Sequence, residues 1–310
     1  MKVLVTGAAG YIGSTLVPML LDQGHQVTCV DNFMYKQTPL LDQCHREGFE
    51  IIRGDTRDQD LMKKLVPKAD VIIPLACLTG APICKADPIG ATTINRDAVI
   101  DIMKMKSSSQ MMIYPCTNSG YGVGQTGLEC DETTPLNPIT LYGKVKVEAE
   151  KALLDNGTCV TFRFATVFGM APRMRLDLLV NDFMYRAIND RAVVLFEAHF
   201  KRNYLHVRDA AGSFMHTMEN YDKMKGQPFN VGLSEANLSK KELCEAIQKI
   251  VPQFTFLESA IGEDPDKRNY IISNAKIEKT GFKTQVGLMD GLKELKKGFE
   301  IIKRNEYGNF

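Results

Sequence analysis

The first thirteen residues constrain the fold more than any other stretch of this chain. Residues 3–5 are an apolar run typical of a buried parallel strand, and three glycines, Gly7, Gly10 and Gly13, follow them. Apolar residues then recur at helical spacing from Leu16 onward. A glycine turn between a strand and a helix lets the backbone approach a pyrophosphate closely, and the helix N-terminus points N–H groups and a positive dipole at it. The stretch therefore predicts a dinucleotide-binding unit.

An acidic residue at the end of the next expected strand completes this pattern. Residues 26–30 form that strand, and Asp31 follows them directly. A carboxylate at this position accepts hydrogen bonds from an adenosine ribose and repels a 2′-phosphate, so the sequence favours NAD over NADP. The alternative interpretation of Asp31 is an aspartate that only caps the loop.

Short apolar runs and helical patterns keep alternating through the first half of the chain. We expect strands at Phe49–Arg53, Val71–Pro74 and 110–114, with helices that end near Leu65 and span about 89–106. Strands separated by helices build a parallel, doubly wound sheet that binds ligands at its carboxyl edge. The predicted fold class is therefore α/β, a Rossmann-type doubly wound parallel sheet with a smaller C-terminal substrate-binding domain.

The length of the chain allows more than one structural unit. Its 310 residues can bury the core of one large domain or of two closely connected ones. Residues 1–165 are the expected NAD-binding domain, and about 203–232 are expected to return to it. Residues 166–202 and 233–310 are the expected substrate-binding region.

Strand ends supply the other candidate cofactor contacts. Asp55, after the third strand, is placed to meet the adenine, and the small residues after the fourth strand leave room for the nicotinamide ribose. The expected cofactor-binding residues are Gly7, Gly10, Tyr11, Ile12, Asp31, Asn32, Asp55, Thr56, Leu75, Ala76, Tyr142, Lys146 and Thr166.

Charge and cysteine usage exclude several kinds of partner. The formal net charge is +1 and there is no basic tract, so neither nucleic acid nor an anionic membrane is an expected partner. No apolar run is long enough for a membrane span, and we expect no signal peptide. The eight cysteines show neither a CxxC motif nor pairing with histidine, which predicts reduced thiols in a cytoplasmic protein and no metal site.

A tyrosine and a lysine one helical turn apart are the candidate catalytic groups. Tyr142 and Lys146 share one face of an expected helix. The lysine ammonium, together with the positive nicotinamide of the oxidised cofactor, favours phenolate and lowers the pKa of the tyrosine. Such a tyrosine can take a proton from a sugar hydroxyl while hydride leaves its carbon, and Thr117 can hydrogen-bond the same oxygen. Alone, such a pair also occurs on solvated helix faces, but behind the glycine pattern we interpret it as catalytic.

These motifs together resemble the extended short-chain dehydrogenase/reductase family and its sugar-nucleotide epimerases and dehydratases. The resemblance implies tightly held NAD and a nucleoside-diphosphate sugar oxidised at C4 of the ring. The stretches that carry it are the glycine turn, Asp31, Thr117 with Tyr121 and Gly122, Tyr142 to Lys146, and residues 163–169, 202–209 and 229–232.

Departures from the family pattern narrow the reaction. Sugar-nucleotide 4,6-dehydratases carry Asp-Glu directly after the active-site threonine, whereas this chain has Asn118 and Ser119, which cannot protonate a leaving hydroxyl at neutral pH. The 3,5-epimerases of this type need a cysteine where Ser119 stands. A C4 epimerase and a C4 dehydrogenase, each with Tyr142 as its only acid/base, remain as alternatives.

Further stretches are similar to one group in the family, the NAD-dependent 4-dehydrogenases of GDP-glycero-manno-heptose from bacterial capsule pathways. Residues 75–85, 118–122, 173–183 and 262–268 carry this likeness. It implies a 4-keto heptose product, with bound NADH reoxidised by a keto acid such as 2-oxoglutarate. A C4 epimerase forms the same ketone as an intermediate, so the motifs distinguish a C4 epimerase from a C4 dehydrogenase poorly.

Polar residues of the second half are the candidate substrate contacts. Arg202 and Arg268 are the expected diphosphate clamps, because a planar guanidinium makes bidentate bonds to phosphate oxygens. A surface ion pair is the alternative for each arginine, and His206 is either a sugar or base contact or a structural histidine. The expected substrate-binding residues are Asn118, Ser119, Arg175, Asp177, Asn181, Arg202 and Arg268.

Two long expected helices suggest self-association. Residues 89–106 and 139–155 carry more apolar positions than one sheet face needs. The resemblance implies that such helices pair across a two-fold axis, so we expect a homodimer; a thicker monomer core is the alternative.

Overall fold

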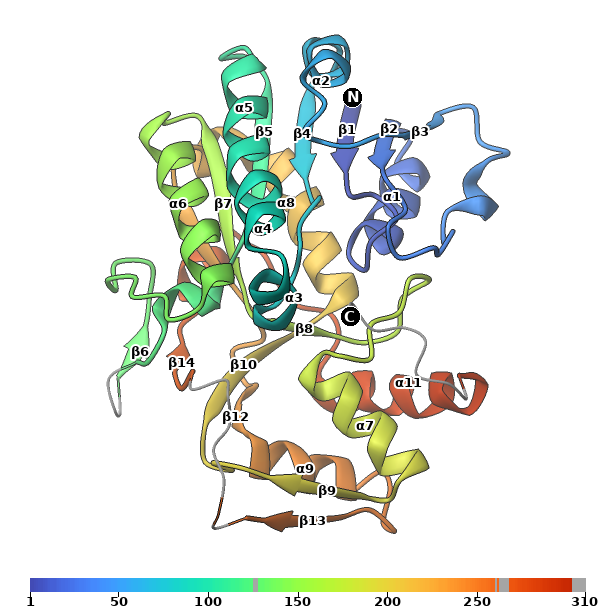
Figure 1. Ribbon diagram of the computed structural model, residues 1–310, viewed down its shortest axis with the longest axis vertical. Helices are drawn as coiled ribbons and strands as arrows, with labels where there is room; N and C mark the ends of the chain where they lie inside the picture. Colours follow the sequence, from blue (N-terminus) through green and yellow to red (C-terminus); the bar gives the residue numbers. More distant parts are fainter. Residues whose placement is uncertain (125–127, 260, 262–267, 303–310) are drawn as a thin grey trace.

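The computed structural model describes residues 1–124, 128–259, 261 and 268–302. Its centre is a seven-stranded sheet in the order β11-β7-β5-β4-β1-β2-β3, with every pair of neighbours parallel (Figure 1). The predicted Rossmann-type α/β class is confirmed. The strands are β1 (Lys2–Thr6), β2 (Gln26–Asp31), β3 (Phe49–Arg53), β4 (Val71–Pro74), β5 (Met111–Thr117), β7 (Cys159–Phe164) and β11 (Pro228–Val231).

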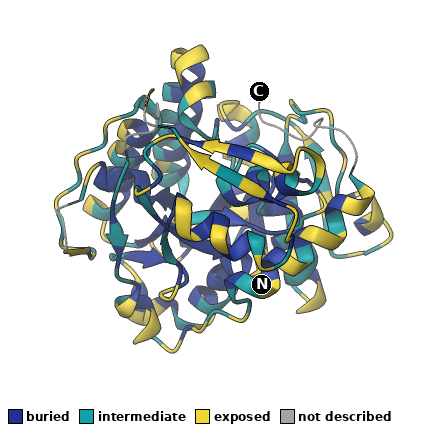
Figure 2. Cartoon of the chain, turned by 90° about the horizontal axis from the view of Figure 1, so that it is seen from below, coloured by how far each residue is buried: buried dark blue, intermediate teal, exposed yellow. Residues whose placement is uncertain are grey.

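Strand residues alternate between the two faces of the sheet, and both faces are buried. Val3 and Val5 belong to a core shared with α1 (Gly13–Asp22) and α8 (Val207–Met224). Leu4 belongs to the opposite core, formed with α2 (Gln59–Leu65), α5 (Ala98–Met105) and α6 (Leu141–Asp155). Figure 2 shows this buried interior inside helices whose outer faces are exposed. Burial on both faces explains why these strands read as continuous apolar runs.

The long helix expected at residues 89–106 is present in three parts. α4 (Pro88–Thr92) continues through a π-helical stretch, Thr93–Asp97, into α5. The stretch holds the buried Asn95, whose amide accepts from the Leu78 N–H and donates to the Leu78 carbonyl at 2.8 and 2.9 Å. The two hydrogen bonds of Asn95 therefore fix the loop that follows β4, at the carboxyl edge of the sheet.

Smaller sheets and helices lie beyond that edge (Figure 1). β8 (Thr166–Phe168), β10 (Lys201–His206) and β12 (Asn237–Ser239) form a three-stranded sheet. From β10 the chain returns through α8 and β11 to the main sheet, and β12 follows β11. The other elements are α3 (Ala81–Ala86), β6 (Glu129–Cys130), α7 (Leu179–Asn189), β9 (Ala192–Leu195), α9 (Lys240–Gln248), β13 (Thr255–Glu258), β14 (Ile271–Ile272), α10 (Ala275–Glu278) and α11 (Leu288–Ile301).

Strand order reverses between β1 and β4, which are neighbours in the sheet. In open α/β sheets, ligands bind where the order reverses, outside the carboxyl ends of the strands.

In the part of the chain that the structure describes, no helix has the length and apolar character of a membrane span.

Candidate active site

The turn between β1 and α1 is built on glycines that leave no room for a side chain. Gly7 has φ +67°, and a Cβ added to it would lie 2.5 Å from the backbone nitrogen of Ala76. A Cβ on Gly13 would lie 2.4 Å from the Ala8 carbonyl oxygen. The turn is thus pressed against the ends of neighbouring backbone segments, and only glycine fits there.

The start of α1 suits an anion. Ile12, the N-cap residue, makes no side-chain hydrogen bond to the helix, so the helix dipole and the first-turn backbone point toward a ligand at the glycine turn. Asp31 lies beside it and accepts hydrogen bonds from the N–H groups of Ala9 (2.9 Å) and Phe33 (2.7 Å). Burial raises the pKa of Asp31 more than these bonds lower it. Asp31 therefore caps the loop, and its oxygens keep further lone pairs for a ribose.

A cavity of about 280 Å³ opens between the glycine turn, the strand ends and the loop after β8. Every candidate cofactor-binding residue lines it, and so do all three candidate catalytic residues. Of the candidate substrate residues, Arg175 and Arg268 line the cavity. Asn118, Ser119, Asp177, Asn181 and Arg202 lie outside its wall.

Tyr142 and Lys146 lie where α6 begins. The hydroxyl of Thr140 accepts the Gly143 N–H at 3.2 Å and caps the helix, so both residues fall in its first two turns. Lys146 is buried, and its ammonium lies 4.1 Å from the centroid of the Tyr114 ring, a cation–π contact that fixes its position.

The surroundings of Tyr142 within the protein raise its pKa. Burial raises the pKa of its phenol above the ordinary value, and the neighbouring Cys77 and Cys116 raise it further, while Arg175 lowers it. Desolvation disfavours the charged phenolate, and within the protein it outweighs nearby cations. A lowered pKa would therefore need the positive charge of a bound oxidised nicotinamide.

A chain of hydroxyls connects Thr117 to a residue far away in the sequence. The Thr117 hydroxyl donates to Ser119 Oγ at 3.0 Å, and the Ser119 N–H donates to Thr117 Oγ1 at 3.1 Å. The guanidinium of Arg268 donates to the same Ser119 oxygen. Three predicted site residues are thus brought together, one of them from the second half of the chain.

The side chain of Asn118 is buried without hydrogen bonds. It is 1% exposed, and neither its amide nitrogen nor its amide oxygen has a partner in the described part of the chain. Leaving buried polar atoms unsatisfied costs about 1–3 kcal/mol. A buried polar group of this kind needs an explanation, such as a catalytic role or a bound water, ion or ligand.

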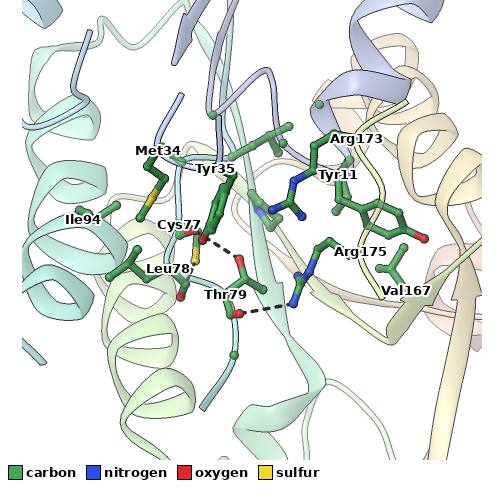
Figure 3. Close-up of a pocket in the computed structure, with 18 of the residues that line it drawn as sticks. Tyr11, Met34, Tyr35, Cys77, Leu78, Thr79, Ile94, Val167, Arg173 and Arg175 are labelled. Atoms are coloured by element: carbon green, nitrogen blue, oxygen red, sulfur yellow. Dashed lines mark hydrogen bonds between the residues drawn. The ribbon is translucent and has the colours of Figure 1, made fainter. Parts of the chain in front are cut away.

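Arg175 crosses the cavity from the loop between β8 and α7. Its guanidinium pairs with Asp177 and donates to the Thr79 carbonyl at 3.4 Å (Figure 3). Asn181 lies behind this loop, where its amide accepts from Gly169 N–H (3.0 Å) and donates to the Arg175 carbonyl (2.8 Å). Asp177 and Asn181 therefore hold Arg175 and its loop in position, and their contact with a substrate stays a prediction.

Arg202 lies away from the cavity wall. It is buried on β10, with its guanidinium carbon 5.7 Å from the centroid of the Tyr270 ring. Its sequence context resembled a diphosphate clamp, but the strand turns the side chain toward Tyr270. Contact with a diphosphate stays a prediction for Arg202.

His206 is a structural histidine in this arrangement. It is fully buried, its Nδ1 accepts the Arg208 N–H at 3.2 Å, and its Nε2 lies 3.2 Å from Glu294 on α11. The guanidinium of Arg208 pairs with the other oxygen of Glu294 at 2.6 Å. Arg208, which replaces the usual acid of the family's motif, thus serves to fasten α11 to the start of α8.

Asp55 has a partner that the sequence interpretation did not include. Arg57 donates to its two oxygens at 2.9 and 2.7 Å, and these hydrogen bonds lower the pKa of Asp55. Asp55 and its neighbour Thr56 both line the cavity.

Two cavity residues were missed because they lie in loops without a regular pattern. Tyr35 comes from the long β2–β3 connection, and Arg173 follows β8. Arg173 carried a signal, since it stands two residues before the predicted Arg175 in a loop expected to face the substrate. Cys77 and Thr79, which also line the cavity, belong to the stretch after β4 that was expected to face the nicotinamide ribose.

The family follows from a comparison with known proteins. A model described as "NAD dependent epimerase/dehydratase family" matches residues 3–232. The chain belongs to this family. The resemblance drawn from the motifs is thereby confirmed at family level.

Relatives of this NAD-dependent epimerase/dehydratase span almost the whole chain. UDP-glucuronic acid decarboxylase 1 of Arabidopsis thaliana is 26% identical over 320 residues, covering 99% of this chain and 71% of the plant protein. The structure of UDP-glucuronic acid 4-epimerase from Bacillus cereus, in complex with UDP-glucuronic acid and NAD, has a TM-score of 0.85 and 24% identity, with coverage of 97% and 99%. UDP-glucose 4-epimerase of Thermus thermophilus, in complex with NAD, has a TM-score of 0.79 and 22% identity, with the same coverage.

NAD is the cofactor of this epimerase/dehydratase family, and the residues present fit it. The glycine cradle that a Cβ would fill lies at an uncapped helix N-terminus, where a pyrophosphate is favoured. The Asp31 carboxylate at the end of β2 occupies the position that meets an adenosine ribose.

Proposed function

We propose that this enzyme oxidises the C4 hydroxyl of a nucleoside-diphosphate sugar, with Thr117, Tyr142 and Lys146 as its catalytic residues. One observation carries the proposal. All three residues line the cavity that the glycine turn also lines, although they come from β5 and α6.

Each of the three residues has a defined task. Tyr142, as phenolate, accepts the proton of the C4 hydroxyl and becomes a neutral phenol, and the Lys146 ammonium stabilises the phenolate before this transfer. Thr117 orients the same hydroxyl oxygen, and its own bond to Ser119 fixes its rotamer. When bound, NAD supplies the acceptor for the hydride that leaves C4.

The neighbours of Thr117 argue against elimination of water. A dehydratase needs a carboxylic acid that can protonate the leaving hydroxyl, and Asn118 and Ser119 are not acids. The Ser119 oxygen accepts from both Thr117 and Arg268, an arrangement for positioning.

The proposed substrate is a GDP-linked sugar, with GDP-glycero-manno-heptose first. The likeness of residues 75–85 and 173–183 to the 4-dehydrogenases of that sugar supports this choice. The product would be the 4-keto heptose, and a keto acid such as 2-oxoglutarate would reoxidise NADH. The alternative is a C4 epimerase, a reaction consistent with the structural similarity to 4-epimerases.

One assay separates the alternatives. Purified protein is incubated with GDP-heptose, GDP-mannose, UDP-glucose and UDP-glucuronic acid, each with and without 2-oxoglutarate, and the absorbance of reduced nicotinamide and the sugar products are followed. NADH formation without 2-oxoglutarate, and ketone formed over many turnovers with it, support the dehydrogenase. A changed sugar without net redox supports the epimerase, and no reaction on any sugar contradicts both.

We also propose a cytoplasmic homodimer that pairs through α5 and α6. Partly exposed apolar side chains remain on both helices, among them Ile100, Met103, Val147 and Leu154. Neighbouring Ile89 on α4 is 77% exposed. Sedimentation of wild type and Val147→Glu tests the pairing, because the added charge should yield a monomer and an unchanged dimer would contradict this interface.

A further inference from the structure

A tyrosine at the cavity has a hydroxyl that the catalytic proposal does not use. Tyr35 comes from the β2–β3 connection and lines the same cavity as Tyr142 and Lys146. Its hydroxyl oxygen is buried, and no group in the described part of the chain forms a hydrogen bond with it. A buried hydroxyl without a partner costs free energy, so this group needs an explanation.

The backbone on both sides of Tyr35 is held in an unfavourable conformation. Phe33 has φ +54° and Lys36 has φ +55°, in the left-handed region that residues other than glycine rarely adopt. The Lys36 N–H donates to the Phe33 carbonyl at 3.0 Å, and the guanidinium carbon of Arg53 lies 4.6 Å from the centroid of the Phe33 ring. These contacts fix the turn that carries Tyr35. Backbone strain of this kind is concentrated in active sites and ligand clamps.

The ring of Tyr35 is directed toward the part of the cavity that Arg175 enters. Its centroid lies 4.4 Å from the guanidinium carbon of Arg173, a stacked contact that holds the ring. Figure 3 shows the phenol pointing toward Cys77 and Thr79, in the loop after β4. The Thr79 carbonyl is the group that accepts a hydrogen bond from Arg175 at 3.4 Å.

The charge of Arg175 acts on two phenols, Tyr35 and Tyr142. It lowers the pKa of each, although burial raises each pKa by more. A raised pKa keeps the Tyr35 hydroxyl protonated at neutral pH, so the hydroxyl is a hydrogen-bond donor. A donor that shares a guanidinium neighbour with the catalytic phenol is suited to an oxygen of the sugar that carries the reacting hydroxyl.

We propose that Tyr35 donates a hydrogen bond to the sugar of the nucleotide-sugar substrate. The inference rests on the proposed function, and it adds a sugar contact from the β2–β3 connection to the catalytic residues of β5 and α6. The Tyr35 side chain is half-buried, so a small rotation brings its hydroxyl from the cavity wall to the ligand. The bound sugar then supplies the partner that the hydroxyl lacks within the described chain.

The test removes only the hydroxyl. Calorimetry on NADH-loaded full-length protein, which cannot oxidise the sugar, measures binding of GDP-heptose, GDP-mannose, UDP-glucose and UDP-glucuronic acid, with GDP and UDP as sugar-free ligands. We expect Tyr35→Phe to weaken the sugar nucleotide that wild type binds most tightly by about 3- to 10-fold, the effect of one lost hydrogen bond, and to leave GDP and UDP unchanged.

Tyr204→Phe is the matched control. The Tyr204 hydroxyl on β10 is also buried without a partner among the described residues, but Tyr204 lies outside the cavity wall. This variant should bind every ligand as wild type does. A loss of sugar affinity equal to that of Tyr35→Phe would show that the position of the hydroxyl is irrelevant and would contradict the proposal.

Kinetics and thermal melting separate a sugar contact from a structural role. In Tyr35→Phe the KM for the sugar nucleotide should rise by a similar factor, and kcat should change less, because the contact is present both before and during the reaction. The melting temperature should be unchanged or higher, since the stacked ring remains and no hydrogen bond is lost.

Three results would overturn the proposal. Equal affinity of wild type and Tyr35→Phe for every sugar nucleotide would exclude a sugar contact. An equal loss for GDP or UDP and for the sugar nucleotides would assign the hydroxyl to the nucleotide, and a loss confined to NAD would assign it to the cofactor. Failure of the proposed function is a different result, because wild type would then bind sugar nucleotides without oxidising them; wild type that binds none of them would contradict both proposals.

Discussion

Tyr142, Lys146 and Thr117 share the cavity for simple reasons of spacing. The lysine stands four positions after the tyrosine, about one helical turn, and Thr117 is the last residue of a strand whose carboxyl end faces the same space. These positions were predictable because they depend on local periodicity. The electrostatic environment of the Tyr142 phenol was not predictable, because the burial that raises its pKa comes from segments far away in the sequence.

Replacing Tyr142 by phenylalanine tests the acid/base. We expect Tyr142→Phe to lower kcat by about 10²- to 10⁴-fold, the range for loss of a positioned acid/base. NAD affinity should stay close to that of wild type, because the ring remains. Turnover is measured with the best sugar nucleotide and NAD binding by calorimetry; retained turnover would remove Tyr142 from the mechanism.

Replacing Asn118 by alanine tests whether its buried amide awaits a ligand. We expect Asn118→Ala to leave the free energy of unfolding unchanged or higher, because no hydrogen bond is lost. The KM for the nucleotide sugar should rise about 10-fold, the effect of one lost hydrogen bond. Asn181→Ala is the contrast, since it removes several bonds and should destabilise by about 2 kcal/mol or more. A normal KM in Asn118→Ala would exclude contact with the sugar.

At the scale of elements, the sequence predicted the parts with regular patterns and missed those set by packing. β3 and β4 have the expected bounds. β4 is buried along its whole length, and a strand buried on both faces appears as an apolar run. The direction of Arg202 and the pairing of Arg208 with Glu294 were not predictable, because each depends on an element distant in the sequence. The π-helical stretch before α5 carried no recognised signal either.

Glu294 should make the attachment of α11 dependent on pH. Burial opposes its ionisation, but the hydrogen bonds from His206 and Arg208 prevail and lower its pKa to about 2. A carboxyl with a lowered pKa stabilises the folded state above its unfolded pKa, and this contribution is lost as the pH falls from about 4.5 toward about 2.

The variant Glu294→Gln should therefore be less stable than wild type at neutral pH, by about 2 kcal/mol. The difference in the free energy of unfolding between Glu294→Gln and wild type should become smaller as the pH falls from about 4.5 toward about 2. Urea unfolding at several pH values measures it, and Asp290→Asn, an exposed neighbour on the same helix, is the control. A gap that does not change with pH would show that the charge of Glu294 is not responsible.

At the scale of the whole molecule, the cavity lies between the main sheet and the smaller sheets and helices. Its walls come from the β1–α1 turn, the ends of β2 to β5 and the loop after β8. The fold class and the position of the site at the carboxyl edge were predictable from alternation of strands and helices. Which second-half residues reach the cavity was not, because that depends on how the smaller elements pack beyond the sheet.

A ligand bound between these two parts should stabilise the whole chain. At a free NAD concentration of 100 times Kd, the free energy of unfolding should rise by about 2.7 kcal/mol. Thermal melting with a series of NAD concentrations measures this. NADP at equal concentrations should stabilise less, because Asp31 disfavours its 2′-phosphate; equal shifts would contradict that role of Asp31.

The contact of Arg268 with Ser119 joins residues 149 positions apart. The family model ends at residue 232, before Arg268. A chimera that took only residues 3–232 from a relative would therefore combine the relative's loop at Thr117 and Ser119 with the Arg268 of this chain. A chimera that transfers substrate specificity should therefore exchange Ser119 and Arg268 together.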